Sequence, residues 1–433
     1  MAVPRIGLYG VLERSEEGWQ QADALLQTVA AALSRGGADV VAAPCLISDD
    51  ATAAAAAAAL AQADPDALAA VVVCWSFDNL TLTLLRRVPR PLAVLAVPGI
   101  KSGSLVGAHQ LGSLLTDLAL PHAVFYGRPD EAATYGPLLS YARAAAAKRR
   151  LEFARLGMVG RRTPGMTPAA FDELEITRLF GAQVVNYDWS EIETRAAALP
   201  ATVVEQQARA LAPAHVHSQA EDIADSSRLF LALAEQAKAD GLAAIAIGCY
   251  PHYAGRACLP CALLGERGIP AACEGDMNSA LAMFLLHHFT AQPVHFGEIL
   301  EIDDAQNSLI TSHCGCAPPS LAADPAHIEI APVRLWRRGA CLRFPAKPGP
   351  ATFVNLVGRR GTYRLCAVHG EAEVTPMLFE GNPVRLRLRP PVRDLLNTIA
   401  EQGFGHHWML GYGHVTPELR AFCKLTGLKG VFL

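Results

Sequence analysis

The chain has 433 residues, which is longer than one ordinary domain and typical of about three. Its net charge is −4 and it has no long basic stripe, which argues against nucleic acid and anionic membrane surfaces as partners. The first residues lack the basic segment and apolar core of a signal peptide, and no uninterrupted apolar run reaches about 18 residues. We therefore expect a soluble cytoplasmic protein that binds small molecules.

The first part of the chain alternates between strand-like apolar runs and helical stretches. This alternation is typical of a parallel sheet covered by helices. We therefore predict a Rossmann-like α/β domain over residues 1–150. Its strand-like runs are 6–11, 40–44, 69–75, 91–97 and 123–126.

A second α/β cycle begins near residue 155 and predicts a second Rossmann-like domain over residues 151–291. Glu274 follows the last strand-like run of this cycle, and Asp276 stands where a helix cap is expected. Open α/β sheets bind ligands at the carboxyl ends of their strands. Glu274 is therefore expected at a ligand-binding edge. The strand-like runs are 155–160, 183–187, 242–247 and 269–273.

Residues 277–289 separate two acidic positions. Their apolar side chains recur at helical spacing, which predicts an amphipathic helix about 20 Å long at 1.5 Å per residue. Glu298 follows Glu274 by 24 residues and lies on the apolar segment after this helix. A strand, a helix and a return strand therefore separate the two acids, and we expect both to face one pocket.

After about residue 292 the sequence changes to short β-like runs punctuated by proline and glycine. This pattern predicts a mainly antiparallel, β-barrel-like domain over residues 292–433. The predicted fold class is therefore α/β, with two Rossmann-like parallel-sheet domains followed by this β-rich domain. Its β-like runs are 328–335, 341–345, 352–357, 362–369 and 384–388.

Two carboxylates and one imidazole would form a hard, oxygen-rich site that suits Mn²⁺ or Mg²⁺ better than zinc. Such carboxylates also serve as general bases that take a proton from the carbon next to a carbonyl. His406 and His407 lie in a glycine-rich segment, which favours close approach of the backbone to a ligand. The residues alone leave structural roles open: a helix-terminus acid for Glu274, an ion pair for Glu298 and packing for the histidine pair.

Two cysteine pairs offer a different kind of site. Cys258 and Cys261, together with Cys314 and Cys316, allow a four-thiolate zinc centre by residue type. The second pair is closer in sequence than the usual spacing of zinc ligands, and the first lies just before a helix. A reactive or pocket-lining cysteine stays open as well.

The arrangement of Glu274, Glu298 and His407 resembles that of the L-fucose isomerase and L-arabinose isomerase superfamily, nearer the fucose branch. The resemblance extends to the Glu274-Gly-Asp276 turn before an apolar helix and to the Gly413-His-Val element after the histidine. It implies a metal-dependent aldose–ketose isomerase that works through an ene-diol. Glu274 and Glu298 would ligate Mn²⁺ or Mg²⁺ and shuttle the proton, and His407 would complete the ligands.

The resemblance also implies residues on the substrate side. Trp75 lies in a Cys-Trp element like the one that contacts sugar from a neighbouring subunit, which implies a homo-oligomer, either a trimer or a hexamer. Tyr250 occupies the place of a sugar-binding glutamine. Ser312 and His313 resemble a pocket-lining region, and His406 is expected beside them. The N-terminal domain would then serve substrate recognition and subunit contacts, and the partner would be a small sugar that the sequence does not identify.

Two other functions remain open from the sequence. Two α/β domains around a cleft also occur in non-catalytic sugar-binding proteins. A zinc hydrolase or lyase would use the cysteine pairs. The joint presence of Glu274, Glu298 and His407 argues against the sugar-binding protein, and metal analysis would separate the zinc enzyme from the isomerase.

Overall fold

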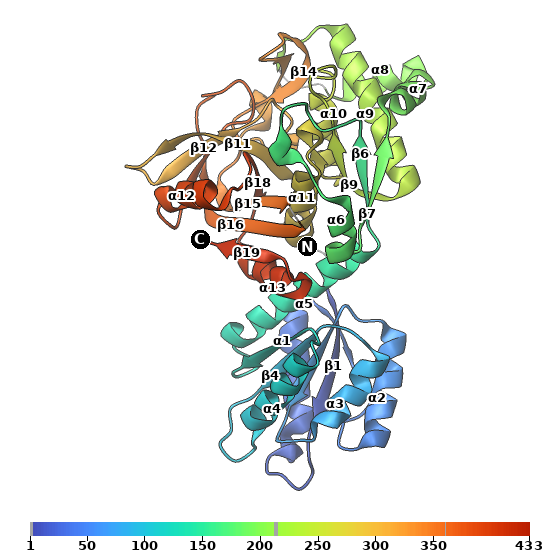
Figure 1. Ribbon diagram of the computed structural model, residues 1–433, viewed down its shortest axis with the longest axis vertical. Coiled ribbons are helices and arrows are strands. Elements are labelled where there is room, and N and C mark those ends of the chain that lie inside the picture. The colour runs from blue at the N-terminus through green and yellow to red at the C-terminus, as the bar shows by residue number, and fades with distance from the viewer. Residues whose placement is uncertain (1–2, 212–214, 360) are drawn as a thin grey trace. The chain divides into compact units, whose positions relative to one another are not determined.

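The computed structural model describes residues 3–211, 215–359 and 361–433 (Figure 1). The chain divides into two compact units. The first contains residues 1–150 and 417–426, and the second contains residues 151–416 and 427–433. Among the described residues, no helix is long and apolar enough to cross a membrane. The three domain boundaries predicted from the sequence stay a prediction.

The first unit is built on a parallel sheet with the strand order β2-β1-β3-β4-β5. Its central strand β3 is buried along its whole length, which explains its continuous apolar sequence. The strands are β1 (Arg5–Val11), β2 (Asp39–Ala42), β3 (Ala67–Val72), β4 (Leu92–Ala96) and β5 (His122–Tyr126). The helices are α1 (Ala22–Arg35), α2 (Asp50–Ala63), α3 (Asp78–Arg87), α4 (Ser104–Asp117), α5 (Ala132–Glu152), which ends in the second unit, and α13 (Thr416–Thr426) from the end of the chain.

The second unit begins with another parallel sheet, in the order β10-β9-β6-β7. Its strands β6, β7 and β9 correspond to predicted strand-like runs. The strands are β6 (Arg155–Val159), β7 (Gln183–Tyr187), β9 (Leu242–Ile247) and the short β10 (Ala271–Ala272). The helices are α6 (Glu173–Phe180), α7 (Trp189–Ala197), α8 (Ala201–Ala210), α9 (Ala220–Asp240), α10 (Cys258–Glu266) and α11 (Met277–Thr290).

An antiparallel barrel completes the second unit. Among the described residues, six strands close it in the order β15-β18-β11-β12-β17-β16, because β16 also pairs with β15. These strands are β11 (Val294–Asp303), β12 (Ser308–Ser312), β15 (Gly349–Arg359), β16 (Thr362–Glu373), β17 (Val384–Leu388) and β18 (His407–Tyr412). The predicted fold class, two parallel-sheet α/β regions followed by a mainly antiparallel barrel, is confirmed.

Smaller elements surround the barrel. The strand β19 (Lys429–Phe432) adds to β16 in parallel, and α12 (Val392–Gln402) precedes the turn into β18. A separate sheet has the order β14-β13-β8. Its strands are β8 (His215–Val216), β13 (Glu329–Val333) and β14 (Arg338–Arg343).

The helix α11 differs from its predicted character. The sequence predicted an amphipathic helix, but all of its residues except His287 and Thr290 are buried. The helix contacts β9 and β10 of the parallel sheet and also β15 and β18 of the barrel. A helix covered on both sides is apolar around its whole circumference. This placement brings the segment before α11 close to the barrel strands.

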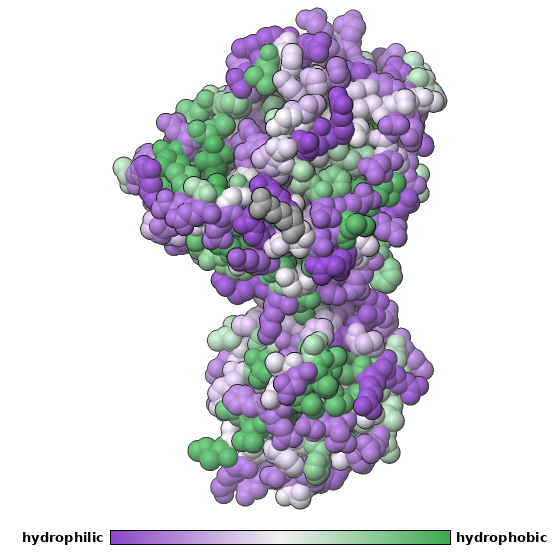
Figure 2. Space-filling view, in the orientation of Figure 1, coloured by the Kyte–Doolittle hydropathy of each residue, from purple (hydrophilic) through white to green (hydrophobic). Residues whose placement is uncertain are grey.

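The displayed face of the second unit is polar over most of its area, with apolar residues gathered near β11 and β12 (Figure 2). Exposed apolar side chains in this unit include Leu300, Leu335, Met377 and Leu378. Apolar side chains exposed together are common where proteins contact one another.

Candidate active site

Glu274 lies on a tight turn between the short strand β10 and α11. Its backbone has φ of 60°, a left-handed conformation that is costly for a residue with a side chain. Its carbonyl accepts a hydrogen bond from Thr163 N at 3.1 Å. The next residue is Gly275, where a Cβ atom would lie 2.8 Å from the Arg161 carbonyl oxygen. The turn therefore has no room to relax, and it fixes a buried carboxylate at the edge of the sheet.

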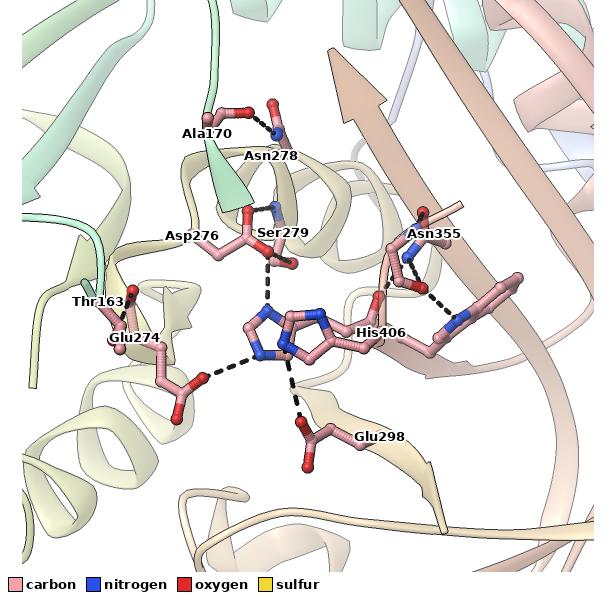
Figure 3. Close-up of polar contacts among 12 residues, drawn as sticks. Thr163, Ala170, Glu274, Asp276, Asn278, Ser279, Glu298, Asn355 and His406 are labelled. Atoms are coloured by element: carbon pink, nitrogen blue, oxygen red, sulfur yellow. Dashed lines mark hydrogen bonds and ion pairs between the residues drawn. The ribbon is translucent and has the colours of Figure 1, made fainter. Parts of the chain in front are cut away.

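Asp276 has two functions in the structure. As the predicted cap of α11, it accepts hydrogen bonds from the Ser279 backbone N–H at 3.1 Å and from the Ser279 hydroxyl at 2.8 Å. It also accepts a hydrogen bond from Nδ1 of His407 at 2.8 Å (Figure 3). A carboxylate on one imidazole nitrogen fixes the tautomer and directs the other nitrogen outward, as in many metal-binding histidines.

The outward nitrogen of His407 faces Glu274. Its Nε2 lies 3.1 Å from Oε2 of Glu274, and the His407 side chain is only 2 % exposed. Burial alone would lower the pKa of His407, but its hydrogen bonds to Asp276 and Glu274 outweigh burial and raise the pKa to about 9. Burial is the largest influence on Glu274 and favours its neutral form, yet the hydrogen bond from His407 and the charges of the neighbouring histidines together outweigh burial and lower the pKa of Glu274. Glu274 is therefore ionised at neutral pH.

Glu298 lies on the barrel strand β11, beside His406 and His407. In the sheet it stands directly opposite His407 of β18, and opposite Ser312 of β12 on its other side. Side chains of directly opposed residues lie on the same face of a sheet. Glu298 therefore projects toward His407, and its Oε1 lies 3.8 Å from Nε2 of His406 (Figure 3).

The segment that carries both histidines is held by Asn355 of β15. The buried Asn355 side chain accepts a hydrogen bond from Gly405 N and donates to the carbonyls of Gly405 and His407. His406 is partly exposed, and burial together with the neighbouring charge of His407 lowers its pKa. His406 is therefore neutral at pH 7, the form in which an imidazole binds a metal.

The donor atoms of these side chains meet in two groups that share His407. One group contains Glu274, His313 and His407, and the other contains Glu298, His406 and His407. Within each group the donor atoms lie within 4.8 Å of one another. Carboxylate oxygens with imidazole nitrogens suit a divalent ion such as Mn²⁺, so the residues present fit the group that the sequence predicted.

The remaining predicted site residues have different surroundings. Ser312 is buried, and its hydroxyl accepts a hydrogen bond from Asn382 N, so its contacts hold the backbone. Tyr250 follows β9, and its ring lies 5.7 Å from that of Trp336. Trp75 belongs to the first unit, where its indole N–H donates to the Gln110 side chain at 3.0 Å. Its predicted role toward the sugar, across a subunit boundary, stays a prediction.

The cysteine pairs do not converge in the way that the alternative zinc centre would need. Within the described parts of the chain, neither group of converging donors includes a cysteine. Cys258 and Cys341 instead belong to a buried apolar cluster against which Cys314 packs.

Sequence reasoning missed two features of this site. It predicted that Asp276 caps α11 but not that Asp276 also bonds to His407. That second contact depends on where the barrel places β18, which no local pattern indicates. It also assigned His313 to the substrate side, whereas the structure places this side chain among the donor atoms around His407. His313 directly follows β12, which lies two strands from β18 in the barrel. Its place in the same predicted β-rich domain was the only indication in the sequence that it could lie near His407.

Comparison with known proteins bears on the nature of the site. Residues 297–429 match the family model of the L-arabinose isomerase C-terminal domain. The chain is 28% identical over 343 residues to sulfoquinovose isomerase of Alkalicoccus urumqiensis, covering 76% of each chain. These matches support the L-arabinose/L-fucose isomerase superfamily. The chain is an isomerase.

A second relative gives the same result. Sulfoquinovose isomerase of Clostridium sp. (strain MSTE9) is 27% identical to this isomerase over 342 residues, again covering 76% of each chain. Among solved structures, a solute binding protein of an ABC transporter from Agrobacterium vitis, bound with alpha-D-tagatopyranose, covers 67% of this chain and 90% of its own. Its identity is 12% and its TM-score 0.18, values that carry no argument about this isomerase. The matches support a sugar aldose–ketose isomerase, and the fucose-like branch stays a prediction.

Proposed function

We propose that this isomerase depends on a divalent metal, with Mn²⁺ or Mg²⁺ held by Glu274, Glu298 and His407. His407 would release the proton of its Nε2 when the ion binds. The single observation that carries the proposal is the position of His407. Asp276 fixes its Nδ1, so that its Nε2 faces Glu274 while Glu298 approaches from the adjoining strand. His313 and His406 are the further donors within reach.

A bound divalent ion would polarise the sugar carbonyl and stabilise the negative charge that develops on the ene-diol oxygens. The chain's own residues supply the proton transfer. Glu274 is ionised and buried, while Glu298 is 35 % exposed and lies on the more open side of His407. We assign the proton shuttle between C1 and C2 to these two carboxylates, because each belongs to one of the two groups of donor atoms that share His407. The reacting oxygens of the substrate would lie beside these groups.

Isomerisation in deuterated water tests this mechanism. With Mn²⁺ present, we expect deuterium on the product carbon, because a carboxylate that takes the proton exchanges it with solvent before returning it. Product formed without any deuterium would contradict the proton shuttle and indicate a hydride shift.

For the substrate we propose a sugar that bears a sulfonate, of the sulfoquinovose type. The support is that the relatives named above carry that name and share 76% of their length with this chain. An anion-binding contact is worth about 1.5 kcal/mol or more, so we expect a preference of roughly tenfold or more over the uncharged D-glucose. Proton NMR of mixtures with Mn²⁺ measures this. Turnover of L-fucose or L-arabinose without turnover of sulfoquinovose would contradict the assignment.

The assembly and location of the enzyme are further proposals. We propose a cytoplasmic homo-oligomer, a trimer or a hexamer, in which Trp75 of one subunit contacts the sugar of another. Size-exclusion chromatography with light scattering measures the oligomeric state, and a monomer with full activity would contradict the role of Trp75.

A further inference from the structure

Cysteine side chains gather beside the candidate active site in the second unit. Cys249 follows β9 and Cys273 follows β10, and their sulfur atoms lie 3.2 Å apart. Both are free thiols. The side chains of Cys261 and Cys316 also interact with the Cys273 thiol. The isomerase chemistry proposed above uses none of these sulfur atoms.

The pair lies next to residues of the site. Cys273 is the residue before Glu274, and Cys249 is the residue before Tyr250. The two cysteines follow neighbouring parallel strands, since Ala272 of β10 pairs with Ala246 of β9. Both side chains are buried, with exposed fractions of 5% for Cys249 and 1% for Cys273. A movement of the Cys273 backbone therefore moves Glu274.

We propose that Cys249 and Cys273 form a reversible disulfide in the presence of a peroxide, and that this bond switches the isomerase off. The thiol of Cys249, the more exposed of the two residues, attacks the peroxide, whose O–O bond breaks to give a sulfenic acid and one water. The sulfur of Cys273 then displaces the sulfenic oxygen, which leaves as a second water. Two thiols and one hydrogen peroxide thus give one disulfide and two waters. The effect on turnover rests on the proposed function, whereas the formation of the bond does not.

The geometry links this bond to Glu274. Disulfide sulfurs are about 2.05 Å apart, so the two sulfur atoms approach by about 1 Å when the bond forms. The turn is fixed on its far side, because Gly275 abuts the Arg161 backbone and Thr163 bonds to the Glu274 carbonyl. Glu274 lies between this fixed side and Cys273 and has an unfavourable positive φ, so a pull on Cys273 shifts the Glu274 carboxylate rather than relaxing the turn. A catalytic group displaced by about 1 Å loses up to about 100-fold in rate.

The test treats the Mn²⁺-loaded full-length protein with hydrogen peroxide, followed by alkylation and peptide mass spectrometry. We expect a cross-linked peptide that joins Cys249 to Cys273, and turnover lower by roughly tenfold or more that dithiothreitol restores. Cys249→Ser should give no cross-link and keep its turnover after peroxide, and Cys273→Ala serves if that variant does not fold. Cys366→Ser, which alters a buried cysteine of the barrel strand β16, is the matched control and should respond as the parent does.

Three results would overturn the proposal. The first is the absence of the cross-link at a peroxide concentration that oxidises the half-buried Cys45. The second is a cross-link from Cys273 to Cys261 or Cys316 in place of Cys249. The third is a Cys249–Cys273 disulfide that leaves turnover unchanged. If the parent protein shows no isomerase activity, the proposed function fails, and the cross-linked peptide together with Mn²⁺ affinity before and after oxidation still decides the proposal.

Discussion

Glu274 and Glu298 reach His407 from two different halves of the second unit, and the halves hold their carboxylates in different ways. Glu274 comes from the parallel sheet, on a turn with positive φ, and its side chain is 10% exposed. Glu298 comes from a regular barrel strand, is 35% exposed and makes a longer contact with His406. The sheet half thus supplies a fixed, ionised carboxylate, and the barrel half supplies a carboxylate with access to solvent.

The largest expected effect is the loss of either carboxylate. We expect Glu274→Gln and Glu298→Gln each to lower kcat by about 10³-fold, because in the proposed mechanism each residue is both a proton carrier and a metal ligand. Glu301→Gln changes an exposed acid of the same strand as Glu298 and should leave kcat within about twofold of the parent. Steady-state kinetics with saturating Mn²⁺ measures this. Near-normal kcat in Glu298→Gln would contradict a catalytic role for the carboxylate of the barrel half.

The second prediction concerns Asp276, the residue of the sheet half that bonds to His407. Asp276→Asn keeps a residue that can cap α11 but removes the negative charge of the carboxylate that bonds to Nδ1 of His407. We therefore expect Mn²⁺ affinity to fall about 10- to 100-fold. Asp172→Asn is the matched control, since Asp172 caps α6 by accepting from Glu175 N at 3.1 Å. Isothermal titration with Mn²⁺ compares the two variants. Equal losses of Mn²⁺ affinity in the two variants would show that loss of a charged helix cap is responsible, and not loss of the contact with His407.

The third prediction concerns pH in protein stripped of divalent ions by a chelator. The pKa of His407 is raised from 6.5 to about 9 in the fold, so its stabilising contribution is complete below pH 6.5 and is lost as the pH rises through about 9. The free energy of unfolding should therefore fall by about 3 kcal/mol over that interval. Urea titrations from pH 6 to pH 10 measure it. The same fall in His407→Gln would assign the pH dependence to other groups.

The smallest effect tests the turn itself. Gly275→Ala places a Cβ against the Arg161 carbonyl at a residue with φ of 69°, whereas Gly403→Ala meets the same kind of φ, 65°, with nothing within 4 Å. Both variants carry the cost of a positive φ, about 1 kcal/mol, and only Gly275→Ala adds a steric clash. Thermal unfolding should therefore place Gly275→Ala below Gly403→Ala. A higher unfolding temperature for Gly275→Ala than for Gly403→Ala would mean that the turn can relax. The turn that carries Glu274 would then not be rigid.

The fold could be predicted to a large extent because its signals are local. Alternating apolar runs specified the parallel sheets, and short runs with proline and glycine specified the barrel. The all-round burial of α11 was not predictable from the helix alone, because it arises from contacts with strands far along the chain, β15 and β18.

The site was predictable in its carboxylates and in His407, which the spacing and the resemblance singled out together. The contact of Asp276 with His407 spans 131 residues of sequence, and no local pattern indicates such a pairing. The same holds for His313, whose ring lies 5.8 Å from that of His407 only because both belong to one barrel. Contacts between side chains that only the folded barrel brings together are therefore the part of the site that is hardest to predict from the sequence.

Metal analysis of purified protein decides whether Glu274, Glu298 and His407 bind Mn²⁺. After incubation with Mn²⁺ and removal of the free ion, the parent and Glu301→Gln should retain about one Mn²⁺ per chain, whereas Glu274→Gln, Glu298→Gln and His407→Gln should retain far less. The same Mn²⁺ content in all five proteins, or zinc retained through Cys258 and Cys261, would contradict the assignment of this metal to Glu274, Glu298 and His407.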